Sequence, residues 1–219
     1  MTVKLNHYWG IIPTLSEEYN KFIVRKFIPG VNQLGMHTVA VWSVLAGVCS
    51  EIIFETACSD LEHLEKALHT KKYKELKTDL FNYIKNYNTK ILVKSDKKDH
   101  YTIDVEENTV KFNQTWDLIS NKRDEYKRFT DQEYYPLLHE LGIEVAREWE
   151  VFIGSGPNII CEGRATDVTK LITNLQSETF HKAERKLKEY VERYESRILT
   201  FHIQKIKGYK SASYRLVSS

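Results

Sequence analysis

The pattern of apolar and polar positions begins with a half-buried strand. Within residues 3–12, Val3, Leu5 and Trp9 share one parity, whereas mostly polar side chains share the other. This period of two is typical of a strand that turns one face to a core. Residues 110–119 show the same pattern. The chain therefore repeats its opening strand.

The elements that follow the strand also occur once in each half. Helical spacing predicts a helix that starts at Thr14, in a capping-box sequence, and is broken or kinked by Pro29. Two runs rich in β-branched and aromatic residues predict a hairpin. A second helix restarts at a new N-cap, Thr70, which Ser177 matches in the other half. The expected elements of the first half are a strand at 3–12, a helix at 14–34, a hairpin at 37–45 and 51–58, helices at 59–84 and a strand at 89–93.

An offset of 107 residues aligns the two halves without a gap. It matches aromatic, proline and glycine positions: Trp9 with Trp116, Pro29 with Pro136, Trp42 with Trp149, and Gly47 with Gly154. Because these are not common surface residues, chance is a poor explanation. We therefore predict two equivalent repeats, at 1–95 and 110–202, with a polar linker at 96–109 and a basic tail at 203–219.

The linker and the tail each carry one further expectation. Residues 100–105 alternate well enough to form a short extra strand. The basic side chains near the end of the chain could form a local patch, although we expect a solvated tail. These side chains are Lys205, Lys207, Lys210 and Arg215.

The order β-α-β-β-α-β is that of the ferredoxin-like unit, an α+β fold with helices on only one face of an antiparallel sheet. The bare face of each sheet would be a large exposed apolar patch, so we expect the two sheets to pack against each other. The Pro-x-x-x-x-Leu-Gly passage beginning at Pro29 and Pro136, and the broken second helices at 68–73 and 175–180, resemble the dimeric α/β barrel superfamily. The resemblance covers nearly the whole chain and implies an internally duplicated, intramolecular dimeric α/β barrel.

The resemblance leaves the function open. The superfamily includes small-molecule monooxygenases, haem-degrading enzymes, isomerases, stress-responsive proteins and duplicated haem proteins such as the chlorite dismutases, so the fold alone does not choose among them. It implies that a ligand cavity lies between the two sheets. The residues to inspect are therefore those on the strand parity that faces away from the helices.

Two asparagines on that parity are the first candidate catalytic residues. Asn6 and Asn113 occupy equivalent positions on the first strand of each repeat, and a polar side chain facing a barrel core needs a partner or water. Asn6 is similar to the first-strand asparagine with which cofactor-free monooxygenases of the superfamily orient a substrate. The alternative is that each asparagine anchors a neighbouring loop or strand. Tyr8, on the same parity, is a candidate substrate-binding residue.

The hairpins supply the remaining candidates. Trp42, Trp149 and Arg147 could contact a flat ligand, although a repeated tryptophan is also common in a core. Glu55 and Glu162 lie mid-strand between apolar neighbours, either on the solvent face or buried. If they are buried, their pKa values should rise, and either carboxylate could act as a general base.

Composition argues against several classes of site and partner. The formal net charge of +2 predicts no attraction to nucleic acid or anionic lipid, and no apolar run is long enough to span a membrane. Three cysteines without CxxC spacing indicate reduced thiols. These features, and the absence of a secretion signal, predict a cytoplasmic protein. Eight histidines without HxH or HExxH spacing predict no metal site and no required cofactor; haem stays an alternative, with His181 or His202 as the axial ligand.

We therefore expect a small-molecule-binding barrel, in its finer form a cofactor-free monooxygenase- or isomerase-like enzyme acting on an aromatic or polyketide-like substrate. The alternative is a non-enzymatic binding or assembly protein with a filled barrel and a possible homo-oligomer. A tandem amino-acid-sensing module is a third possibility, but such modules usually accompany a catalytic domain. A cavity of at least ~300 Å³ with convergent polar groups would favour the enzyme.

Overall fold

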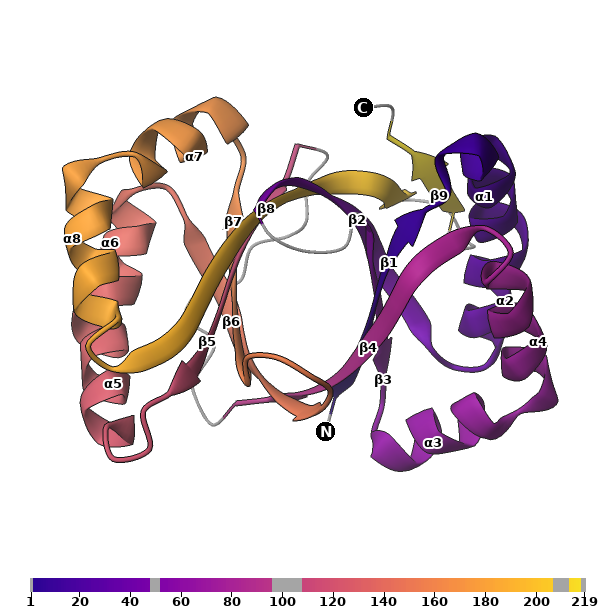
Figure 1. The fold of residues 1–219 in the computed structure, drawn as a ribbon, viewed down its shortest axis with the longest axis horizontal. Coiled ribbons are helices and arrows are strands. Elements are labelled where there is room, and N and C mark those ends of the chain that lie inside the picture. Colours follow the sequence, from indigo (N-terminus) through magenta and orange to yellow (C-terminus); the bar gives the residue numbers. More distant parts are fainter. Residues whose placement is uncertain (1, 48–51, 96–107, 207–212, 218–219) are drawn as a thin grey trace.

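Each half of the chain forms a four-stranded antiparallel sheet with helices on one face (Figure 1). The computed structural model describes residues 2–47, 52–95, 108–206 and 213–217. The first half contains β1 (Val3–Ile11), α1 (Ser16–Phe22), α2 (Ile28–Gln33), β2 (His37–Gly47), β3 (Ile52–Cys58), α3 (Leu61–His69), α4 (Lys71–Leu80) and β4 (Ile84–Lys94). The second contains β5 (Val110–Leu118), α5 (Arg123–Phe129), α6 (Tyr135–Glu140), β6 (Glu144–Ile153), β7 (Ile159–Ala165), α7 (Val168–Leu175), α8 (Glu178–Leu187), β8 (Val191–Ile206) and β9 (Ser213–Leu216). The predicted βαββαβ order, written twice, is confirmed.

The two sheets close into one barrel. Strand β4 pairs with β6, β2 pairs with β8, and the order around the barrel is β2-β3-β1-β4-β6-β7-β5-β8. Figure 1 shows the ring of strands with α1 to α4 outside one half and α5 to α8 outside the other. All pairings are antiparallel, so β1 and β5 run in the same direction. Equivalent residues of the two repeats therefore lie at the same end of the barrel, and the predicted intramolecular dimeric α/β barrel is confirmed.

Strand parity divides the buried residues into a helix-facing set and an inward-facing set. Val3, Leu5 and Trp9 belong to an apolar core shared with the helices, and the second repeat has its own core of the same kind. Smaller apolar clusters lie on the other face, around Trp42 in one half and Trp149 in the other. Because β1 and β5 are buried on both faces, polar side chains of inward parity lie in the barrel interior.

The first helix of each repeat contains a π-helical segment just before its proline. These segments are Ile23–Phe27 and Thr130–Tyr134, and each leads into a helix whose first turn contains Pro29 or Pro136. Since proline cannot donate a backbone hydrogen bond, a local widening of the helix is a physical alternative to a break. The predicted interruption is thus a π segment, and the helix continues beyond it.

The three expected N-caps have different outcomes. Thr70 and Ser177 cap α4 and α8 through their side chains, as predicted. Thr14 does not cap α1, because Pro13 starts a short 3-10 turn and Leu15 takes the N-cap position.

None of the helices in the described part of the chain is both long and apolar enough to cross a membrane.

The end of the chain differs from the expected solvated tail at 203–219. Strand β8 continues to Ile206, and β9 pairs with it. Tyr214 of β9 accepts a hydrogen bond at 3.2 Å from Asn32 Nδ2 in the first repeat. The predicted strand at 100–105, most of the linker at 96–109, and Lys207 and Lys210 lie outside the described residues.

Candidate functional site

Four charged side chains form a closed ion network in the barrel interior. Lys4 and Lys111 come from β1 and β5, and Glu55 and Glu162 come from β3 and β7; all four are at most 4% exposed. Lys111 Nζ lies 2.6 Å from Glu55 Oε1 and 2.7 Å from Glu162 Oε1. Lys4 Nζ lies 2.5 Å from Glu162 Oε1 and 3.3 Å from Glu55 Oε1. The network is therefore electrically neutral and follows the approximate twofold axis of the barrel.

The two repeated tryptophans extend this network. Trp42 Nε1 donates to Glu55 Oε2 at 2.9 Å, and Trp149 Nε1 donates to Glu162 Oε2 at 3.0 Å. Each carboxylate thus accepts hydrogen bonds on both of its oxygens, which offsets part of the cost of burying its charge. Each indole therefore helps to hold its glutamate in place.

Both indole rings already have neighbours from the protein. The Trp42 ring stacks on Phe201 at 4.2 Å and has Lys111 Nζ at 5.1 Å from its centroid. The Trp149 ring has Arg147 at 5.2 Å and Lys4 Nζ at 5.0 Å from its centroid. Such cation–π and stacked contacts use the ring faces that a flat ligand would need. Arg147 is half-buried, on the same strand as Trp149.

The electrostatics of Glu162 differ from the expectation. Burial alone raises the pKa of its carboxyl, but the opposing attraction of Lys111 and Lys4 is larger in sum and holds the pKa well below the usual range. The expected rise on burial is therefore wrong for this residue. A carboxylate held anionic by two lysines is a weak base at neutral pH, so the geometry supports a structural ion network rather than general-base chemistry at Glu162.

The two candidate asparagines lie further along the same strands. Asn6 and Asn113 are 1% and 4% exposed, and the Oδ1 atom of each is buried without a hydrogen-bond partner among the described residues. Asn6 Nδ2 is 3.4 Å from the hydroxyl of Tyr8, two residues away on the same strand. Thr115 Oγ1, at the position equivalent to Tyr8, is also buried without a partner in the described chain. Among the described residues, the side-chain hydrogen bond of Asn6 stays within its own strand, and it gives no support to the alternative that this asparagine anchors a neighbouring loop or strand.

Two basic residues that the sequence reasoning did not select lie beside these asparagines. Lys90 on β4 is directly opposite Asn6, and Arg197 on β8 is directly opposite Asn113. Directly paired residues point to the same face of a sheet, so both basic side chains belong to the inward-facing set. The offset of 107 residues relates Lys90 to Arg197, and this equivalence was the sequence signal that could have identified them.

Lys4 and Lys111 have the inward parity in the sequence, but nothing in the sequence indicates that they pair with the glutamates.

Tyr8 is another titratable group at this end of the barrel. Burial is the main cause that raises its pKa to about 12, against a smaller opposing effect of its hydrogen bond with Asn6. The Tyr8 phenol is therefore protonated at neutral pH. It can donate a hydrogen bond toward a molecule in the barrel.

A second polar cluster lies between the sheet and helices of the first repeat. His7 Nδ1 is 2.9 Å from the hydroxyl of Tyr87, and Tyr87 borders a cavity of about 340 Å³. Burial lowers the pKa of His7 to about 3, so its ring is neutral. In the second repeat the equivalent residue is Gln114, which accepts a hydrogen bond at 3.0 Å from Tyr194. A neutral amide thus takes the place of the imidazole in the second repeat, and His7 Nε2 and Gln114 Nε2 are both buried without a hydrogen-bond partner among the described residues. The cavity is lined by Leu5, Leu68, His69, Tyr73, Lys74, Lys77, Tyr87, Thr89, Ile91 and Ile153.

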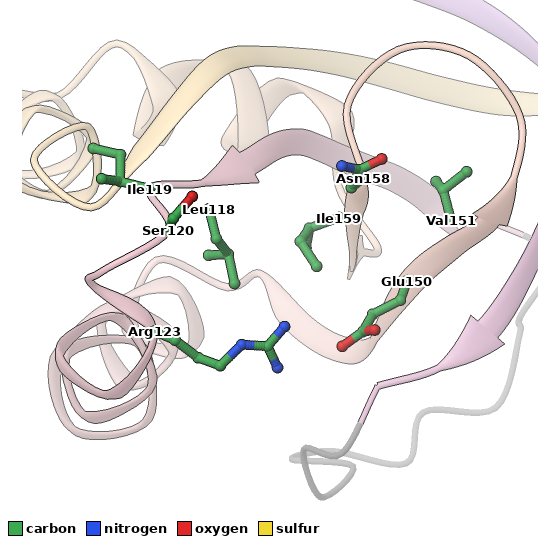
Figure 2. Close-up of a pocket in the computed structure, with 8 residues that line it drawn as sticks. All are labelled: Leu118, Ile119, Ser120, Arg123, Glu150, Val151, Asn158 and Ile159. Carbon is green, nitrogen blue, oxygen red and sulfur yellow. The ribbon is translucent and has the colours of Figure 1, made fainter.

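A further cavity, of about 440 Å³, opens beside the end of β5 (Figure 2). Figure 2 shows the side chains of Arg123 and Glu150 directed toward each other across it. None of the residues predicted for the site lines this cavity. Its lining comprises Leu118, Ile119, Ser120, Arg123, Glu150, Val151, Asn158 and Ile159.

The two histidines considered as haem ligands do not fit that role. His181 lies on α8 with its side chain 48% exposed, 3.6 Å from Glu184. His202 Nε2 is 2.9 Å from Asn20 Oδ1 of α1, on the helix side of the sheet. Neither borders the cavities above, and the sheet-to-helix layer of the second repeat is occupied by its apolar core. Among the described residues, no group of three or more histidine, cysteine or acidic side chains is placed to bind a metal ion.

Comparison with known proteins identifies the fold. No family model and no curated protein matches the sequence. A solved structure described as a "putative monooxygenase" from Fusobacterium nucleatum is similar, with a TM-score of 0.65, 12% identity and coverage of 91% of this chain and 92% of that one. An anthrone oxidase-like protein gives a TM-score of 0.58 at 13% identity and 91% coverage of both chains. A chlorite dismutase from Candidatus Nitrospira defluvii gives 0.59 at 9% identity, covering 91% of this chain and 90% of that one.

These similarities define the class of protein. The chain has the fold of the dimeric α/β barrel proteins, with both halves supplied by one polypeptide. At such low identities the likeness extends to the fold alone, and activity must be argued from this chain's own residues.

Proposed function

We propose that the protein binds a small organic molecule in the barrel interior, at the end to which β1 and β5 run. The observation that carries this proposal is the pair of buried amide oxygens, Asn6 Oδ1 and Asn113 Oδ1, that have no partner in the described chain. A buried polar atom left unpaired costs about 1–3 kcal/mol, and nearly all such atoms in native proteins are paired with protein, water or ligand. Both copies of the repeat keep this costly arrangement, which favours a bound molecule with hydrogen-bond donors.

The ion network gives this site a rigid floor. Lys4, Lys111, Glu55 and Glu162 satisfy one another, so the groups left to contact a ligand are those beyond the network. Asn6, Asn113 and Tyr8 are the proposed ligand-contacting residues. Trp42, Trp149 and Arg147 then support the floor instead of stacking on the ligand.

A catalytic role is the finer form of this proposal. Either amide could orient an aromatic or polyketide-like substrate for a cofactor-free monooxygenase- or isomerase-like reaction, and similar folds described as a "putative monooxygenase" and an anthrone oxidase-like protein support this. The proposal involves no haem, because His181 and His202 are unsuited to bind it in the barrel. A cytoplasmic location stays a prediction.

Small hydroxyaromatic molecules are suitable probes of the binding proposal. Isothermal titration of the full chain with 3-hydroxybenzyl alcohol and 3-hydroxybenzoate should detect binding. Asn6→Leu and Asn113→Leu, which keep side-chain volume and remove the amide, should abolish it. Asn82→Ala, at an exposed position, is the matched control and should bind as the wild type does. A crystal structure with both amide oxygens bonded to ordered water, together with no binding of either probe, would refute the proposal.

The alternative, a protein that acts by self-assembly, has one observation in its favour. Leu45 and Phe152 occupy equivalent positions near the ends of the two long hairpins and are 54% and 58% exposed, and Ile153 beside them is 57% exposed. Exposed apolar patches often mark interfaces. Light scattering of the wild type and of a Leu45→Ser, Phe152→Ser variant tests this homo-oligomer: a dimer that the substitutions dissociate would support it.

A further inference from the structure

We infer that the molecule bound in the barrel is an anion that also carries hydroxyl or N–H donors, and that Lys90 and Arg197 bind its charge. This inference rests on the proposed function and specifies its ligand. Neither residue belongs to the ion network, and the 107-residue offset places them at equivalent positions of the two repeats.

The two cations lie at the same level as the two amides. Lys90 is the strand partner of Asn6, and Arg197 is the strand partner of Asn113. Lys90 is 8% exposed, and the Arg197 side chain is 10% exposed. Arg197 Nε is buried and has no partner among the described residues. Each repeat thus contributes one amide and one cation to the same end of the barrel.

The local charges leave a cation uncompensated. The charged groups that act on Lys90 are Arg197, Glu195, Asp117 and Arg193. Asp117 forms an ion pair with Arg193. The side chain of Glu195 is 45% exposed and lies 3.6 Å from Arg197 Nη2. Within the described chain Lys90 has no ion-pair partner. A mostly buried ammonium without a counter-charge is unfavourable, and an anionic ligand would supply the missing charge.

Two hairpin glycines pack directly on these cations. A Cβ atom at Gly154 would lie 2.9 Å from Lys90 Cγ, and one at Gly47 would lie 2.8 Å from Arg197 Cβ. Both glycines have positive φ, of 147° and 114°. The hairpin of each repeat therefore covers the stem of the cation in the other repeat, at a distance that only glycine permits. Lys90 Nζ would lie 3.3 Å from a Cβ atom at Gly156 of the same hairpin.

The polar atoms around this position define the ligand further. Lys90, Arg197 and the Tyr8 hydroxyl can donate hydrogen bonds, which suits a carboxylate or a phosphate group. The Oδ1 atoms of Asn6 and Asn113 can only accept, so they require donors on the same ligand. A hydroxycarboxylate satisfies both requirements, whereas a simple carboxylate or a neutral alcohol satisfies one.

Three related probes separate these requirements. 3-Hydroxybenzoate carries a carboxylate and a hydroxyl group that cannot bond each other, benzoate lacks the hydroxyl, and 3-hydroxybenzyl alcohol lacks the charge. Titration calorimetry on the full chain should rank 3-hydroxybenzoate first. Lys90→Met should weaken 3-hydroxybenzoate binding about tenfold or more, as expected for loss of one charge-assisted hydrogen bond, and Arg197→Gln should do the same independently. The matched control is Lys85→Met, which removes the same charge from an exposed position on the same strand.

The possible results have distinct meanings. Preference for 3-hydroxybenzoate over both other probes, lost in Lys90→Met and Arg197→Gln but kept in Lys85→Met, would support the inference. Equal binding of 3-hydroxybenzoate and 3-hydroxybenzyl alcohol, unaffected by Lys90→Met but lost in Asn6→Leu, would overturn the anion inference and leave the proposed function standing. If none of the three probes binds, the inference is overturned, and the proposed function is refuted as well when both amide oxygens are bonded to ordered water. Circular dichroism would verify that each variant is folded.

Discussion

Substitution of Lys111 by methionine tests the ion network most directly. Lys111 Nζ contacts Glu55 at 2.6 Å and Glu162 at 2.7 Å, and its side chain is 2% exposed. Methionine fills nearly the same volume but leaves two buried carboxylates to share Lys4. Removing one partner of a buried ion pair costs about 3–5 kcal/mol. Because Lys111 contacts two carboxylates, we expect the free energy of unfolding to fall by an amount near the upper value. This is a large share of the roughly 5–15 kcal/mol that stabilises a domain.

The stability lost in Lys111→Met should be partly regained when the positive and negative charges of the network are equal in number again. In a Lys111→Met, Glu55→Leu double variant, Lys4 and Glu162 remain as a pair at 2.5 Å. We expect the double variant to be more stable than the sum of the single effects predicts, by about 1–3 kcal/mol. Urea unfolding followed by tryptophan fluorescence and circular dichroism measures each value. Lys21→Met, in an exposed ion pair, is the control and should change little.

A loss below about 1 kcal/mol in Lys111→Met would refute this reasoning, because an unbalanced carboxylate in a dry interior cannot be so well tolerated. Strict additivity in the double variant would equally contradict it. Either result would mean that water reaches the network and screens it.

Three further predictions follow from the same geometry. Asn6→Leu and Asn113→Leu should leave the melting temperature unchanged or raise it, since each removes an unpartnered buried oxygen and Asn6→Leu breaks only the long 3.4 Å contact with Tyr8; a clear fall in the melting temperature would instead indicate a structural hydrogen bond. Because the pKa of Glu162 is depressed in the folded protein, its ion pairing contributes its full stability above the unfolded pKa of about 4.3, and this stability is lost progressively as the pH falls below that value. Urea midpoints measured from pH 7 to pH 3 should therefore decrease toward low pH, and the decrease should be smaller in Glu162→Gln. Gly35→Ala should lower the free energy of unfolding more than Gly142→Ala does. Both glycines have positive φ, of 79° and 72°, but only at Gly35 would the new Cβ collide with a side chain, 2.1 Å from His63 Nε2. Equal urea midpoints for the two variants would contradict this.

The duplicated fold could be predicted because its evidence is periodic. Alternation placed Lys4 and Asn6 on the inward parity, and the 107-residue offset identified each strand twice. The predictions about the fold that failed concerned local detail. The capping box at Thr14 was wrong because Pro13 begins a 3-10 turn, and the expected tail is partly a strand because β8 continues beyond its pairing with β5.

The candidate site was only partly predictable for a different reason. Parity indicates which face a side chain occupies, but not which residue from the other repeat it meets. Lys4 and Glu162 are 158 positions apart, so their contact, and with it the lowered pKa of Glu162, depends on closure of the barrel. Lys90 and Arg197 were missed because a lysine matched with an arginine looks like an ordinary surface exchange until the strand register is known.

Fusion of the two halves has a consequence for molecular recognition. A barrel assembled from two identical chains has a strict dyad, so any lopsided guest on that axis can sit in two equally favourable orientations. Here the symmetry is imperfect, because Tyr8 is matched by a threonine in the second repeat and Lys90 by an arginine. A single polypeptide can therefore hold an unsymmetrical guest in one preferred pose, which two identical chains cannot distinguish from its symmetry mate.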